Sequence, residues 1–162
     1  MNAALQQLID SLRNELQQYG EMLALLEAQQ DVLSGPGPSS VLNSIAVAEG
    51  QAAAVFTARQ SRENCQRQLA WALGRPEGEV FTEILPLLPT DCRPLVSALV
   101  EEINQSLKLV RTRAGLSHDQ LRRSVVLMER FLVSLSSEAW SASLGETDPS
   151  PADPPPRFAA TP

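Results

Sequence analysis

The chain has 162 residues and a formal net charge of −6 at pH 7, with a pI near 4.8. An acidic balance disfavours nucleic acid as a partner, because its phosphates carry the same sign of charge. Aromatic residues make up only 4% of the chain, too few to fill a globular interior, whereas Leu, Ala, Gln, Glu and Arg are abundant. The composition therefore favours an all-α helical bundle or coiled coil.

Targeting and redox signals are weak in this sequence. No apolar run approaches the roughly 20 residues that span a bilayer, and residues 1–7 lack the basic and apolar regions of a signal peptide. We therefore expect a cytoplasmic protein without membrane insertion. Cys65 and Cys92 fit no zinc or redox spacing, so we interpret them as reduced structural thiols.

The first predicted helix spans residues 2–33. Its apolar side chains recur at alternating intervals of three and four, which is the heptad seam of a helix that lies along other helices. The seam consists of Ile9, Leu12, Leu16, Tyr19, Leu23, Leu26 and Leu33. Ser34-Gly35-Pro36-Gly37-Pro38 ends the helix.

A second helix is predicted over residues 40–73, with Ser40 as N-cap and Gly74 as the stop signal. Its seam is weaker, because charged and amide side chains alternate with the apolar ones. The apolar register is Leu42, Ile45, Ala52, Phe56, Ala70 and Leu73, and the polar core positions are Glu49, Arg59, Glu63 and Gln66. We expect the middle of this helix to be hydrated or loosely packed.

Residues 75–93 form a proline-containing linker with one short helical turn around 79–85, followed by a third helix over residues 93–139. Asp91 is a candidate cap for the third helix, and Pro94 fits its first turn. The register runs through Val100, Ile103, Leu107, Val110, Ala114, Leu121, Met128, Phe131 and Leu135. We predict one continuous helix; a break at Gly115, with Ser117 capping a fourth helix, remains the alternative.

The predicted organisation is a helical domain over residues 1–140 and a Pro-rich disordered tail over residues 141–162. At roughly 1.5 Å per residue the three helices span about 48, 51 and 69 Å. The predicted fold is thus an elongated antiparallel three-helix bundle with a long third helix. If that helix begins level with the end of the second, its apolar end at 126–139 must be covered by the tail, a fold-back at Gly115, a second copy or a partner.

Charge supports pairing of the first and third helices. Residues 1–38 contain five acidic residues and one Arg, a net charge of −4, whereas residues 105–135 contain six basic and two acidic residues, a net charge of +4. The two helices can present complementary edges, although each exposed pair contributes only about 0 to 1 kcal/mol. The alternative, in which the charged side chains of each helix simply face solvent without pairing, explains the same charge distribution equally well.

No constellation for catalysis is present in the sequence. His118 is the only histidine, no GxxxxGK[ST] or GxGxxG loop occurs, and Ser117-His118-Asp119 are neighbours whose side chains point apart on a helix. We therefore predict no enzyme activity and no catalytic, cofactor or metal site. Trp71 and Trp140 are expected to anchor the core from helix ends, with partner contact as the alternative, above all for Trp140.

The layout resembles the FlgN family. The features that carry the resemblance are the Leu- and Gln-rich first helix, Arg67-Gln68-Leu69-Ala70-Trp71-Ala72-Leu73-Gly74, Ile84-Leu85-Pro86-Leu87-Leu88-Pro89, and Leu99-Val100-Glu101-Glu102-Ile103-Asn104. The resemblance implies a cytoplasmic flagellar export chaperone without cofactor. Such a chaperone binds C-terminal helical segments of the hook-filament junction proteins and delivers them to the type III export apparatus.

The family's substrate contacts fall mainly in the C-terminal part of the chain, which coincides with the uncovered end of the third helix. A partner helix can dock there on an apolar face. The predicted partner-binding residues are Leu121, Val125, Met128, Leu132 and Leu135. The alternative function is a coiled-coil scaffold or adaptor that forms a homo-oligomer through the first-helix seam.

Overall fold

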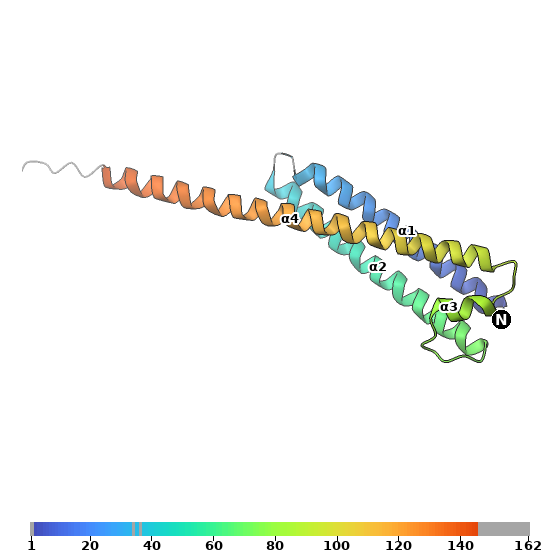
Figure 1. Cartoon of the computed structure of the whole chain (residues 1–162). Helices are drawn as coiled ribbons and strands as arrows, with labels where there is room; N and C mark the ends of the chain where they lie inside the picture. The colour runs from blue at the N-terminus through green and yellow to red at the C-terminus, as the bar shows by residue number, and fades with distance from the viewer. Residues whose placement is uncertain (1, 34, 36, 146–162) are drawn as a thin grey trace, which may run out of the picture. The chain divides into compact units, whose positions relative to one another are not determined.

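The computed structural model describes residues 2–33, 35 and 37–145. It contains the helices α1 (Asn2–Leu33), α2 (Pro38–Ala72), α3 (Phe81–Ile84) and α4 (Arg93–Gly145) and the 3-10 helix η1 (Leu85–Leu87) (Figure 1). The described residues contain no strand, so the predicted all-α class is confirmed. The chain divides into unit 1 (Met1–Leu121) and unit 2 (Arg122–Pro162), and α4 contributes residues to both.

Unit 1 is a helical bundle in which α2 runs antiparallel to α1 and to the first part of α4 (Figure 1). α1 and α2 make the most extensive contact between elements, and α3, η1 and the first turns of α4 meet the N-terminal half of α1 (Figure 1). The buried core lies at this end of the unit. Its members are Leu5, Leu8, Ile9, Leu12, Tyr19, Leu69, Ala70, Ile84, Leu88, Val96, Leu99 and Ile103.

α1 contributes two buried stripes to unit 1. The predicted seam is confirmed, since none of its seven side chains is exposed and Ile9, Leu12, Tyr19 and Leu26 are fully buried. A second stripe, Leu5, Leu8, Ser11, Glu15 and Gln29, is also buried. α1 has a second buried stripe because it contacts two neighbouring helices. Glu15 of this stripe pairs with Arg62 of α2, and on the other side the carboxylate of Glu27 lies 3.6 Å from Arg113 of α4.

The boundaries of α2 refine the prediction. The helix begins at Pro38 rather than after Ser40, because proline fits the first helical position, and extended Gly37 precedes it. The predicted stop at Gly74 is confirmed: Gly74 has φ +70°, and its N–H and that of Arg75 donate to the carbonyls of Trp71 and Ala70 at 2.9 Å. This is a Schellman motif, which needs a left-handed residue such as glycine.

The predicted apolar register of α2 is correct at Ile45, Ala70 and Leu73, which are buried or partly buried, but wrong at Leu42, Ala52 and Phe56, which are exposed. Leu42 and Phe56 are 68% and 61% exposed, whereas Val55 is partly buried and Ala58 fully buried. The inward face includes Arg62, which is paired, and Gln51, whose amide donates to Gln18 of α1. In its middle the helix is rotated by about one residue from the prediction, because it meets α1 there through small and polar side chains and leaves Leu42 and Phe56 outside.

α4 is continuous through Gly115, as predicted, and the alternative break is absent. It begins at Arg93 directly after Cys92, so Asp91 lies too early to be the N-cap. It ends at Gly145 instead of 139, because no proline or glycine interrupts residues 139–144. The remainder of the predicted tail, residues 146–162, lies outside the described residues.

Two further expectations concern Trp71 and membrane insertion. Trp71 is 75% exposed and does not anchor the core, while the side chain of Trp140 lies outside the described part of the chain.

By length and composition α2 is apolar enough to cross a membrane, so the expectation of no such run is wrong. Because the helix packs on α1 and holds an ion pair, one weakly apolar helix does not indicate a membrane protein.

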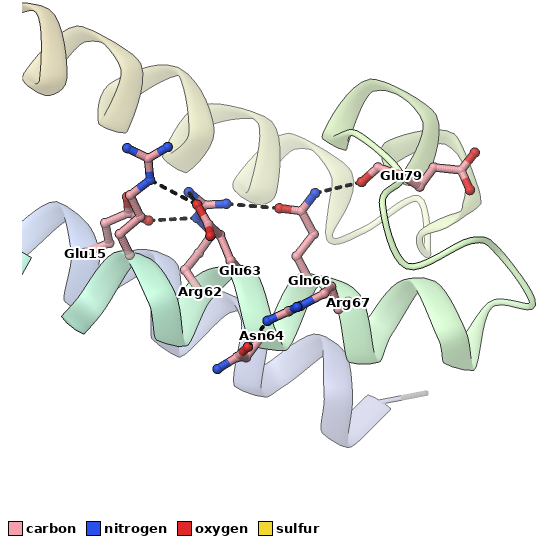
Figure 2. Close-up of polar contacts among 8 residues, drawn as sticks. Glu15, Arg62, Glu63, Asn64, Gln66, Arg67 and Glu79 are labelled. Carbon is pink, nitrogen blue, oxygen red and sulfur yellow. Dashed lines mark hydrogen bonds and ion pairs between the residues drawn. The ribbon is translucent and has the colours of Figure 1, made fainter. Parts of the chain in front are cut away.

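A buried ion pair joins α1 to α2 (Figure 2). Glu15 is only 1% exposed, and the Nε of Arg62 donates to its carboxylate at 2.8 Å. A carboxylate with so little contact with water requires a partner to remain charged. The pair therefore fixes the register between the two helices.

The same arginine also organises the linker. Its Nη1 donates to the Oε1 of Gln66, whose own amide donates to the backbone carbonyl of Glu79 at 2.8 Å (Figure 2). The guanidinium lies 5.9 Å from the ring centroid of Phe81 in α3. These contacts hold α3 so that Ile84 is fully buried in the core.

Breaking this pair on one side should destabilise the protein strongly. We expect Arg62→Met to lower the free energy of unfolding by about 3–5 kcal/mol, because the carboxylate of Glu15 stays buried without its cationic partner. Adding Glu15→Leu should restore most of the loss, since both charges are then removed. Urea unfolding followed by circular dichroism measures both changes.

The matched control is Arg59→Met on the same helix. Arg59 pairs with Glu63 at 3.0 Å, but both side chains are nearly half exposed. Its loss should change the unfolding free energy by no more than about 1 kcal/mol. Equal effects of the two arginine variants would contradict the assigned role of the buried pair.

Tyr19 is a second buried titratable group beside Glu15. Burial raises the pKa of its phenol above 10.0, and the negative charge of Glu15 raises it further. Folding thus favours the neutral phenol. Its contribution to stability is complete below the unfolded pKa of about 10 and is lost as pH rises through the folded pKa.

Tyr19 is the only tyrosine, so phenolate absorbance reports this group alone. We expect the folded protein to titrate at higher pH than the urea-unfolded protein. Tyr19→Phe should weaken the decline in unfolding free energy above about pH 10. A phenolate midpoint that is the same with and without urea would refute this assignment.

Candidate partner-binding surface

Unit 2 presents exposed apolar side chains on α4. Between residues 122 and 136 every side chain is exposed, and the apolar ones are 40–68% exposed. They are Val125, Val126, Leu127, Met128, Phe131, Leu132, Val133 and Leu135. A contiguous apolar surface of this kind indicates an interaction site.

Four of the five predicted partner-binding residues share one face of this segment. Val125, Met128, Leu132 and Leu135 follow intervals of three and four and are all exposed; we call them the C-terminal stripe. Leu121, the fifth, is the last residue of unit 1 and is half-buried there.

The apolar surface is wider than the predicted stripe. Phe131 lies beside it in the helical register and is 62% exposed, while Val126 and Val133, seven residues apart, occupy another face of the helix. The repeat of valine at a seven-residue interval is the signal in the sequence that identifies this second face. A partner can therefore contact more of the helix than one seam.

Positive charge accompanies the apolar side chains. Arg122, Arg123 and Arg130 are exposed between residues 122 and 136, and Glu129 is the one acidic residue there. Charges at the edge of an interface steer association and select partners of complementary sign. This surface therefore favours a partner with acidic residues beside its own apolar face.

The described residues show no arrangement suited to catalysis. Ser117 is buried, whereas His118 and Asp119 are exposed, so these neighbours do not form a triad. The part of the chain that the structure describes contains no group of three His, Cys, Asp or Glu residues that could hold a metal ion. A hollow of about 350 Å³ in unit 1 is lined by Arg62 and Phe81, but Arg62 is already paired with Glu15.

The fold and this surface define a helical protein-binding protein, in which unit 1 is packed and unit 2 presents apolar side chains. A family model described as FlgN protein matches residues 1–142, and the chain belongs to the FlgN family. No curated protein and no solved structure matches the chain. FlgN proteins are soluble flagellar export chaperones, which act by binding other proteins.

Proposed function

We propose that this protein is a cytoplasmic export chaperone for the hook-filament junction proteins. It binds their C-terminal helical segments and delivers them to the export apparatus. The observation that supports the proposal is the exposed C-terminal stripe, whose spacing matches what an amphipathic partner helix requires. Leu121 occupies the preceding position of the same spacing and is included in the proposed contact.

The energetics indicate how much surface the partner must contact. The four side chains of the C-terminal stripe are 46–60% exposed, so complete burial gives roughly 3 to 6 kcal/mol, about half of the 1.5 to 3 kcal/mol that each would give from full exposure. Association costs about 4 to 15 kcal/mol. The stripe alone therefore supports at most a modest affinity, so Phe131 and the basic residues beside it are needed as well. Met128 helps the surface to adapt to its partner.

Self-association through the first-helix seam is the weaker alternative. The seam residues Ile9, Leu12 and Tyr19 are buried within unit 1 against the other helices. A second chain could use them only if the bundle opened. The exposed apolar residues of unit 2 require no such opening.

A charged substitution on the stripe tests the proposal. Leu132→Asp should weaken binding of a purified C-terminal segment of a hook-filament junction protein by about tenfold or more, because the carboxylate would be desolvated in the interface. Isothermal titration calorimetry measures the loss.

Leu109→Asp is the matched control, since Leu109 is an exposed leucine of α4 within unit 1. It should bind like the wild type. The proposal fails if the wild type does not bind the segment, or if both variants bind as the wild type does.

A further inference from the structure

The outer face of α2 carries an apolar surface that unit 1 leaves uncovered. Leu42 and Phe56 are exposed, and Ala46 and Ala53 lie exposed between them on the same face. Only 6% of the most apolar window of α2 is buried. Exposed apolar side chains that gather on one face of a helix indicate an interaction surface.

The spacing on this face is that of a second helix-packing seam. Leu42, Ala46, Glu49, Ala53, Phe56 and Gln60 alternate intervals of four and three, and all six are exposed. We call these six residues the α2 outer seam. It lies opposite the side that carries Ala58 and Arg62 and faces α1. Both long faces of this helix therefore suit helix packing, and α1 occupies one of them.

We propose that the α2 outer seam binds the same seam of a second copy of this chain, with the two α2 helices antiparallel. In the register centred near residue 51, Phe56 of each chain lies against Ala46 of the other, and Glu49 lies against Ala53. The large phenyl ring thus fills the space above a small residue, twice, as a two-fold axis requires. The match of large with small side chains is the property that favours a second copy over an unrelated partner.

Charge selects the antiparallel direction. A parallel pair would place Glu49 of one chain opposite Glu49 of the other, and two like charges at such a position repel. In the antiparallel register each Glu49 faces alanine, so the two carboxylates do not meet, but each loses contact with water, which lowers the affinity of the dimer. Gly50 is also exposed, and a Cβ at this position would meet nothing within 4 Å in the single chain. Glycine in a helix interior is unfavourable, and its small size permits close approach of another helix.

The seam is short and contains one charged residue and one amide, so the dimer should be weak and should depend on protein concentration. It is independent of the proposed chaperone function, because α2 lies in unit 1 and the C-terminal stripe lies in unit 2. A failure of one proposal therefore leaves the other intact.

A size-swap experiment on the full chain tests the proposed register. Sedimentation equilibrium of the wild type should show a mass rising from that of the 17.6 kDa monomer towards twice this value with concentration. Ala46→Phe should abolish the dimer, because two phenyl rings would meet at each contact. The double variant Ala46→Phe/Phe56→Ala should restore it, because each large residue again faces a small one.

The restoration is specific to a second copy. Residues 46 and 56 are separated by about 15 Å along one helix, so they cannot compensate each other within a single chain. Circular dichroism serves as the folding control, and both positions are exposed in unit 1. A wild type that stays monomeric, a dimer that survives Ala46→Phe, or a double variant that stays monomeric would each overturn the proposal.

Discussion

The Glu15 carboxylate is the constraint on which unit 1 depends. It is almost completely buried, so α2 must place Arg62 against it, and this fixes how far the two helices slide and rotate relative to each other. The remaining groups of the arginine then hold Gln66 and Phe81, which position the linker and let Ile84 enter the core. The polar contact between Glu15 and Arg62 thus determines where Ile84 packs in the apolar core.

That register also decides which apolar side chains stay outside. With Arg62 facing α1, the face of α2 that carries Leu42 and Phe56 points to solvent. In unit 2 the C-terminal stripe is exposed as well. The family defines a chaperone, and a chaperone acts through surfaces of this kind. The structure exposes two such surfaces, the α2 outer seam on unit 1 and the C-terminal stripe on unit 2. We propose that the first binds a second copy of the chain and that the second binds the export partner.

Periodicity predicted most of the fold but not the rotation of α2. The bounds of α1, the left-handed stop at Gly74 and the continuity of α4 through Gly115 follow from spacing and local backbone chemistry. Hydropathy assigned Phe56 to the core and placed Arg59 and Glu63 among the polar core positions, but it did not single out Arg62. No count of apolar residues reveals that Glu15 on another helix is the partner of Arg62. Spacing identified the face of α4 that carries the C-terminal stripe. It did not reveal that Leu121, which precedes the stripe at the same spacing, is half-buried, because that depends on tertiary packing in unit 1.

We propose that residues 122–136 of α4 form the surface on which the export partner docks. Hydrogen–deuterium exchange of the full chain, with and without the C-terminal segment of a hook-filament junction protein, tests it most directly. We expect the partner to slow exchange in residues 122–136 and to leave exchange in α2 unchanged. Slowed exchange confined to α1 and α2, with residues 122–136 unaffected, would contradict it.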